Sequence, residues 1–77
     1  MTGNETMANF SARKLAEQVT VTCYRKTETM TRRKALEFYY EGMKCSEGSE
    51  HERYETIFFQ LLEGRMTASD EIPMWEL

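Results

Sequence analysis

Hydrophobic residues recur with the period of an α-helix in the second half of the chain. The spacings of three and four place these side chains on one helical face: Tyr54, Ile57, Phe58, Leu61 and Leu62. Ser49 and Glu52 fit a capping box at the start of this segment. Gly64 follows the last apolar residue and suits a left-handed C-terminal cap. The pattern predicts a helix from Glu50 to Glu63.

A second amphipathic segment runs from Thr31 to Lys44. Its main apolar face consists of Leu36, Tyr39, Tyr40 and Met43. An adjoining stripe holds further small or apolar residues: Ala35, Phe38, Gly42 and Cys45. So wide an apolar surface predicts a helix that is covered from two directions, and Gly42 indicates a close approach by a neighbour. With the acidic turn at 45–49 between them, the two segments predict an antiparallel helical hairpin.

Residues Gln18 to Arg25 are rich in β-branched and aromatic side chains, which predicts a strand. The following residues, Lys26 to Met30, are predicted to form a loop. A strand needs a partner for its backbone hydrogen bonds, and Arg65 to Ser69 is the intramolecular candidate. The alternative is pairing with the same strand of a second chain, which would make a homodimer.

These elements predict a small α+β domain of the order strand–helix–helix, with a second strand expected after the helices. It is dominated by helix and built on the antiparallel hairpin. A chain of 77 residues allows one domain with a small core. We expect residues 1–8 to form a leader, 9–69 the domain and 70–77 an acidic and aromatic tail. Asn9 or Ser11 is predicted to cap a short helix from Ala12 to Glu17.

Composition and charge narrow the class of protein. The net charge of −3 disfavours a surface that binds nucleic acid or acidic lipid over its whole area. The sequence contains no apolar run long enough to cross a membrane, and residues 1–9 lack the apolar stretch of a signal peptide. Cys23 and Cys45 are therefore expected in a reducing cytoplasm, as small buried side chains rather than as a disulfide or reactive thiols.

The sequence contains no pattern typical of catalysis. It has no glycine-rich phosphate loop, no Cys-x-x-Cys pair and no nucleophile elbow. His51, Cys45 and Glu47 lack the spacing of a zinc site. Acidic pairs such as Glu50 and Glu55 are predicted to face solvent, and nothing in the sequence indicates the burial that suits a carboxyl group to acid–base catalysis. We therefore expect no enzymatic activity, no metal and no cofactor.

Protein binding is the leading functional prediction. Phe38 and Phe59 lie outside the main apolar faces of their helices, so they either pack on the strand and N-terminal helix or form an exposed association surface. The tail with Trp75 either folds back or docks in a groove of a partner. The predicted partner-binding residues are Phe38, Phe59, Glu47, Glu50, Glu52 and Trp75.

A nucleic-acid-binding regulator is the alternative. Half of the ten Lys and Arg residues fall in one basic run: Arg25, Lys26, Arg32, Arg33 and Lys34. In an antiparallel hairpin, this run and the acidic turn are expected at opposite ends of the molecule. The reading helix of a helix-turn-helix would begin with Glu50 and Glu52, which phosphates repel. Protein binding is therefore favoured.

Three segments of the chain resemble a group of short bacterial proteins. Met30–Tyr39, Cys45–Glu50 and Glu52–Tyr54 resemble short uncharacterised accessory proteins of gut-bacterial mobile elements, over roughly Val19 to Asp70. No activity is assigned to that group, so no site residue is transferred. The resemblance implies a compact phage- or transposon-borne accessory protein that works by stoichiometric binding, for example as an inhibitor of a CRISPR nuclease.

Overall fold

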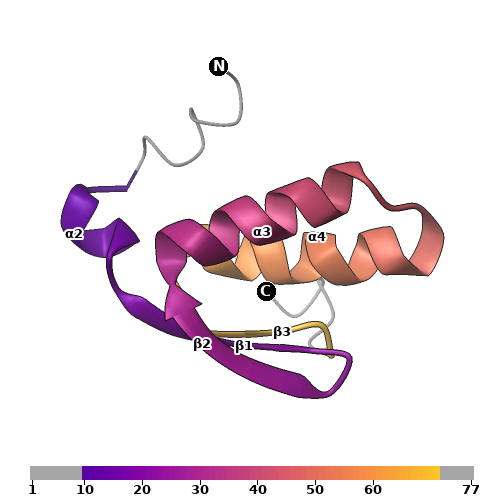
Figure 1. Ribbon diagram of the computed structural model, residues 1–77, viewed down its shortest axis with the longest axis horizontal. Coiled ribbons are helices and arrows are strands. Elements are labelled where there is room, and N and C mark those ends of the chain that lie inside the picture. Colours follow the sequence, from indigo (N-terminus) through magenta and orange to yellow (C-terminus); the bar gives the residue numbers. More distant parts are fainter. Residues whose placement is uncertain (1–9, 72–77) are drawn as a thin grey trace.

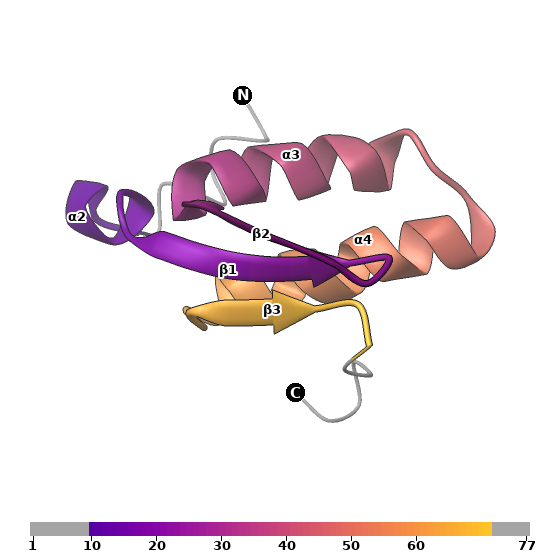
Figure 2. The same ribbon diagram turned by 60° about the horizontal axis from the view of Figure 1, so that its bottom comes forward.

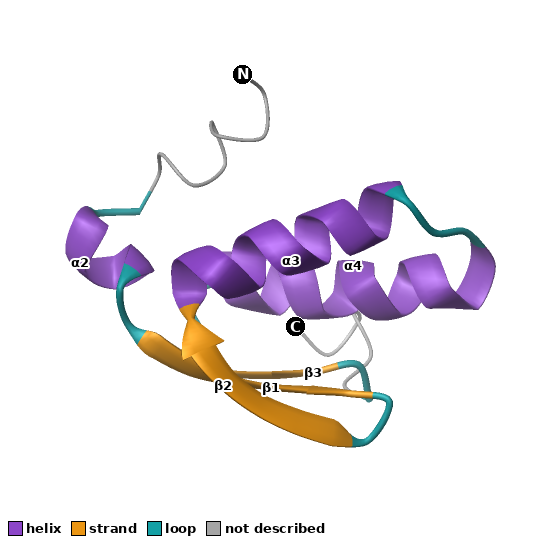
Figure 3. Cartoon of the chain, in the orientation of Figure 1, coloured by secondary structure: helices purple, strands orange, loops and turns teal. Residues whose placement is uncertain are grey.

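A three-stranded sheet carries a pair of antiparallel helices on one of its faces (Figure 1, Figure 3). The computed structural model describes residues 10–71. The elements in chain order are α2 Ala12–Leu15, β1 Gln18–Cys23, β2 Lys26–Thr31, α3 Arg32–Lys44, α4 Gly48–Leu62 and β3 Thr67–Ser69. This architecture confirms the predicted α+β class and the helical hairpin. The predicted leader, and the tail from residue 72 on, lie outside the described residues.

The core lies between the sheet and the two long helices. Val19 and Val21 point from β1 into the core, where they meet buried residues of α3 and α4 such as Leu36 and Ile57. Side chains alternate along a strand, so the opposite face of the sheet holds the intervening hydroxyl residues. By strand register these are Thr20, Thr22, Thr27, Thr29, Thr67 and Ser69. None of the helices within residues 10–71 lies on this second face (Figure 1).

The largest difference from the sequence prediction is β2. Residues Lys26 to Met30, predicted as a loop, belong to a strand that pairs antiparallel with β1 from Gln18↔Thr31 to Cys23↔Lys26. β1 accordingly ends at Cys23, because Tyr24 and Arg25 form a two-residue hairpin turn with φ values of 53° and 64°. Both values are positive, as in a type I′ turn, where Asn-Gly is the usual sequence. Because Tyr24 and Arg25 do not match that turn sequence, the hairpin could not be predicted from the sequence.

The predicted second strand is confirmed, although it is shorter and parallel to β1. β3 pairs Thr20 with Thr67 and Thr22 with Ser69 (Figure 2). The amide of Thr20 donates to the Met66 carbonyl at 2.9 Å. β1 is therefore the central strand, and both of its neighbours come from the same chain. The hydrogen bonds of β1 are satisfied without a second copy.

The caps and close contacts of the helices correct one prediction and confirm two. α4 begins at Gly48 with Glu47 as N-cap and no side-chain cap bond, so the predicted capping box of Ser49 and Glu52 is wrong: both residues lie inside the helix. Ser11 does cap α2, because its hydroxyl accepts from the Lys14 amide at 3.1 Å. A Cβ at Gly42 would lie 3.0 Å from the ring of Tyr54 on α4. That contact explains why glycine stands there.

Candidate functional site

The two edges of the sheet differ. The outer edge of β3 is closed by Gln60, a fully buried residue of α4. The side-chain Nε2 of Gln60 donates to the Ser69 carbonyl at 2.8 Å, and its Oε1 accepts from the Ser69 amide at 2.9 Å. One side-chain amide thus does for β3 what a neighbouring strand would do. The main-chain groups of Ser69 are therefore not offered to a partner.

The outer edge of β2 has no such cover. The Arg32 amide donates to the Glu17 carbonyl at 2.8 Å, so Gln18 and Thr31 face each other as a non-hydrogen-bonded pair. Hydrogen-bonded and non-hydrogen-bonded pairs alternate, which directs the N–H and C=O groups of Thr27 and Thr29 away from β1. Within residues 10–71, no strand pairs with these groups. β2 therefore presents a free edge.

An apolar groove runs beside this free edge, between β2 and α3. Its volume is about 370 Å³, and it is lined by Glu28, Thr29, Met30, Lys34 and Phe38. The Phe38 side chain is 56% exposed, the most exposed large hydrophobic residue described. A free strand edge beside an apolar hollow is the arrangement that recognises an extended peptide. We name the edge and these five residues the β2 edge groove.

The sequence fixes the geometry of the β2 edge groove locally. Thr31 is both the last residue of β2 and the N-cap of α3, where its hydroxyl accepts from the Lys34 amide at 3.2 Å. No linker therefore separates strand and helix. Leu36 and Tyr39 are buried in the core, which fixes the rotation of α3 and turns Phe38 outward over β2.

Of the other predicted partner-binding residues, those that the structure describes do not join the β2 edge groove. Phe59 is 37% exposed on α4, where its ring packs against that of Phe58 at a centroid distance of 5.8 Å. Glu47, Glu50 and Glu52 are exposed around the start of α4. Trp75 lies outside the described residues. Of the predicted residues that the structure describes, only Phe38 borders the free edge.

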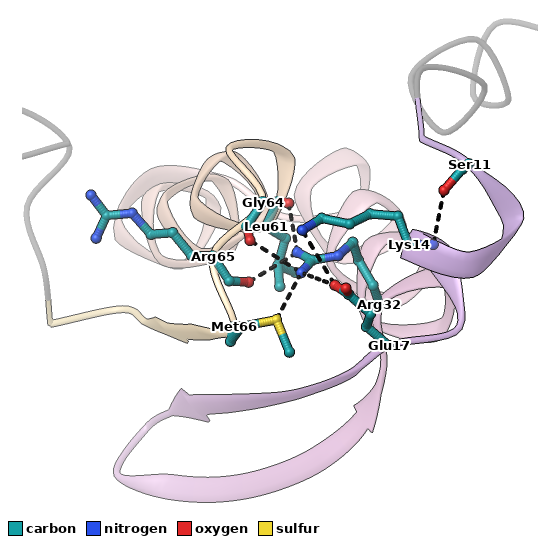
Figure 4. Close-up of polar contacts among 8 residues, drawn as sticks. All are labelled: Ser11, Lys14, Glu17, Arg32, Leu61, Gly64, Arg65 and Met66. Atoms are coloured by element: carbon teal, nitrogen blue, oxygen red, sulfur yellow. Dashed lines mark hydrogen bonds and ion pairs between the residues drawn. The ribbon is translucent and has the colours of Figure 1, made fainter.

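Arg32 corrects the predicted basic surface. Its side chain is 0% exposed, so it is not available to a phosphate. Its guanidinium donates to the carbonyls of Leu61 at 3.0 Å and Arg65 at 2.9 Å, and pairs with Glu17 at 3.1 Å (Figure 4). The last carbonyls of a helix lack intrahelical donors, and a cation near them interacts favourably with the negative end of the helix dipole. Arg32 is therefore a structural cap of α4.

The remaining cations do not form one patch either. Arg25 and Lys26 lie at the hairpin turn, whereas Arg33 and Lys34 lie at the start of α3, with β2 between the two pairs. The Arg53 guanidinium of α4 stacks over the Tyr24 ring at 4.6 Å, so the turn lies beside the acidic first half of α4. The expected separation of the whole basic run from the acidic turn is wrong in this respect (Figure 1).

Asp70 holds the hairpin turn in place. Its side chain is 1% exposed, and its Oδ2 accepts from the Tyr24 amide and from Arg53, both at 3.0 Å. Burial and the nearby Asp70 carboxylate raise the pKa of the Cys23 thiol to about 11. A second hollow of about 280 Å³ lies here, lined by Tyr24, Arg25, Arg53 and Glu71. Because Arg53 is already paired with Asp70, we assign this cluster a structural role.

Among residues 10–71, no group of three or more His, Cys, Asp or Glu side chains is placed to hold a metal ion. In the same part of the chain, no helix is long and apolar enough to span a membrane.

No protein-family model matches the sequence, and no curated protein or solved structure matches it significantly.

Proposed function

We propose that this is a non-catalytic protein that works by stoichiometric binding of another protein, and that it binds an extended segment of that partner at the β2 edge groove. The observation that carries the proposal is the juxtaposition of Thr27 and Thr29, whose main-chain groups point outward, with the exposed ring of Phe38. An added strand would satisfy these groups, and one of its side chains would cover the ring.

Two kinds of interaction support such a complex. Each new backbone hydrogen bond contributes about 1 kcal/mol net. Covering the exposed half of a phenylalanine side chain contributes roughly another 1 kcal/mol. The edge alone would accept many sequences, because its groups belong to the main chain. The hollow between Met30 and Phe38 adds preference for an apolar side chain at one position of the partner.

We also propose a narrower role, which rests on the resemblance to accessory proteins of mobile elements. The resemblance suggests a mobile-element accessory protein that inhibits a host factor such as a CRISPR nuclease. We also propose a cytoplasmic location, supported by the free thiols of Cys23 and Cys45. The alternative of nucleic-acid binding has weaker support, because Arg32 is buried and the other cations are divided between two regions.

A peptide library displayed on phage and selected against the full-length protein tests the proposal without a known partner. Thr29→Pro removes the outward N–H from the edge, where proline is tolerated, and Thr29→Ala is its control because it keeps that N–H. Phe38→Ser removes the apolar wall, and Phe59→Ser is its control. Circular dichroism would establish that all four variants fold.

We expect selected peptides to bind wild type, Thr29→Ala and Phe59→Ser with similar dissociation constants. Binding to Thr29→Pro and to Phe38→Ser should be weaker by about 5-fold or more, since each removes interactions worth about 1 kcal/mol or more. Peptides that bind folded Thr29→Pro as tightly as Thr29→Ala would overturn strand addition at this edge.

A further inference from the structure

We infer that the β2 edge groove recognises a strand antiparallel to β2 that carries an apolar, a basic and an acidic residue at alternate positions, in that order from its N-terminus. This inference rests on the proposed function and specifies the chemistry of the partner. It follows from the direction in which alternate β2 side chains point and from the charges they leave unpaired.

The helix-facing side chains of β2 are Lys26, Glu28 and Met30. Met30 is opposite Val19 and Glu28 is opposite Val21 in the register, and both valines point into the core. Thr27 and Thr29 alternate with them on the open face. A strand added to the outer edge would follow the same alternation, so every second side chain of that strand would enter the groove beside α3.

The three positions differ in chemistry. Met30 lies with Phe38 in the groove, which suits an apolar neighbour; Lys34 lines the same hollow, and a lysine can cover apolar surface with its stem while its amine stays in water. Glu28 and Lys26 form no ion pair within residues 10–71. Opposite charges directly across a strand pair stabilise it. Glu28 therefore favours a basic neighbour and Lys26 an acidic one.

Direction sets the order of these residues. In an antiparallel complex, the partner passes Met30 first, then Glu28, then Lys26, because β2 runs from Lys26 to Thr31. We choose the antiparallel direction because its pairs are slightly more stable per residue and place side chains directly opposite one another. The partner pattern is therefore apolar–x–basic–x–acidic, where x faces the threonines of the open face.

The same reasoning disfavours a second copy as the occupant. Antiparallel pairing must join residues whose main-chain groups point outward, and centring the pair on position 28 sets Glu28 against its own copy. Centring on Thr29 sets Glu28 against Met30. In the first register the two Glu28 carboxylates repel each other, and in the second register Glu28 has no cation opposite it. Of the remaining registers, centring on Met30 sets Glu28 against Arg32, which begins α3, so the charges of Glu28 and Lys26 again lack a strand partner.

The other register sets Thr27 against Thr27 of the copy. It does bring Lys26 beside Glu28, but it sets Thr29 against Arg25, which lies in the turn at a φ of 64°. Such a residue is not in a strand conformation. The pairing would end after its central pair, so β2 complements a foreign segment better than itself.

Two synthetic peptides of identical composition test the inference. The matched peptide is Thr-Leu-Thr-Lys-Thr-Glu-Thr, and the swapped peptide is Thr-Leu-Thr-Glu-Thr-Lys-Thr. Their dissociation constants are measured against the full-length protein and against the double variant Lys26→Glu with Glu28→Lys. Both substituted side chains are exposed, so the variant should fold, and circular dichroism would check that it does.

We expect the matched peptide to bind wild type roughly 10-fold more tightly than the swapped peptide, because two attractive pairs replace two repulsive ones. The preference should invert in the double variant. An equal affinity for both peptides, lost in Thr29→Pro, would overturn the charge pattern and leave the proposed function intact. Library peptides with a different pattern would do the same.

Three outcomes point to other occupants or to none. A mass that doubles with concentration and returns to monomer in Thr29→Pro would identify a second copy and overturn the inference. Peptide binding that tightens in Trp75→Ser would identify the C-terminal segment of the chain itself as the occupant, with the same consequence. If no peptide of any pattern depends on Thr29, the inference and the proposed function both fail.

Discussion

The side-chain amide of Gln60 forms two hydrogen bonds with the backbone of Ser69, at 2.8 and 2.9 Å. These bonds link the middle of α4 to the outer edge of the last strand and close that edge. An open strand edge invites pairing with other chains, and proteins commonly cover it. Here one edge is closed by a buried side chain while the other, at β2, is left free beside an apolar groove. That asymmetry is the main structural reason for placing the binding site at β2.

Replacing Gln60 by leucine should destabilise the fold. The Ser69 N–H and C=O would both lose their partner in a partly buried setting, which we expect to lower the free energy of unfolding by about 2–4 kcal/mol. Urea unfolding followed by circular dichroism measures this. Gln60→Glu keeps an acceptor for the Ser69 amide, but it buries a carboxylate whose second oxygen faces the Ser69 carbonyl, so its effect at pH 7 should be at least as large. A Gln60→Leu protein as stable as wild type would contradict the structural role of the amide.

Arg32→Met should be among the most damaging single substitutions in the chain. It leaves the carbonyls of Leu61, Gly64 and Arg65 without their donor, and we expect a loss of about 3–5 kcal/mol in the free energy of unfolding. Arg33→Met, at the next and exposed position, is the matched control and should change stability by less than about 0.5 kcal/mol. Equal effects of the two substitutions would show that Arg32 does not cap α4.

Stability should fall in acid partly through Glu17. The hydrogen bond from Arg32 is the main cause that holds the pKa of the Glu17 carboxyl below its usual value of 4.5. A lowered pKa in the folded state means that Glu17 stabilises the fold above about pH 4.5, and that this contribution is lost as the pH falls through the lowered pKa. Unfolding curves recorded between pH 7 and pH 3 measure the trend.

Glu17→Gln is the control for that pH dependence, because it cannot ionise. It should be less stable than wild type at pH 7, and the difference between the two proteins should shrink as the pH approaches 3. A difference that stays constant over this range would assign the acid sensitivity to other carboxyl groups.

The two thiols should react at very different rates. Burial and Asp70 raise the pKa of Cys23 from 9.0 to about 11, which lowers its thiolate fraction near pH 8 by about 100-fold relative to an unshifted thiol. Cys45 is exposed. In Cys45→Ser protein, labelling with a thiol-specific disulfide reagent should therefore be slow, whereas Cys23→Ser protein should react quickly. Comparable rates would mean that the turn around Cys23 opens readily.

The helical hairpin could be predicted from sequence because its signals are local. Leu36 and Tyr39, like Ile57 and Leu61, recur at helical spacing, and the left-handed cap expected at Gly64 occurs at a φ of 89°. Gly42 inside α3 correctly indicated a close neighbour. These features depend on residues a few positions apart, which is where pattern analysis is strong.

The free edge was missed because its determinants are distant in sequence. The turn at Tyr24 lacks the glycine or asparagine that marks a hairpin, and is held instead by Asp70, 46 residues away. Arg32 was predicted on the surface because it belongs to a run of cations, and the four other members of that run are indeed exposed. Only the fold brings the C-terminal end of α4 against Arg32 and buries it. Phe38 was identified as surplus, but the strand beside it was not, so the groove could not be foreseen.

The sheet order has a consequence for how the chain folds as it is synthesised. β1 is the central strand and is made well before β3, its parallel neighbour, which is the last of the elements within residues 10–71. The β1–β2 hairpin and the helix pair need only nearby contacts, which form quickly, but the β1–β3 pair must wait for a loop of more than forty residues to close. Until Thr67 leaves the ribosome, β1 is open on its other side. The nascent chain thus has two free edges, and completing its C-terminal strand removes one of them.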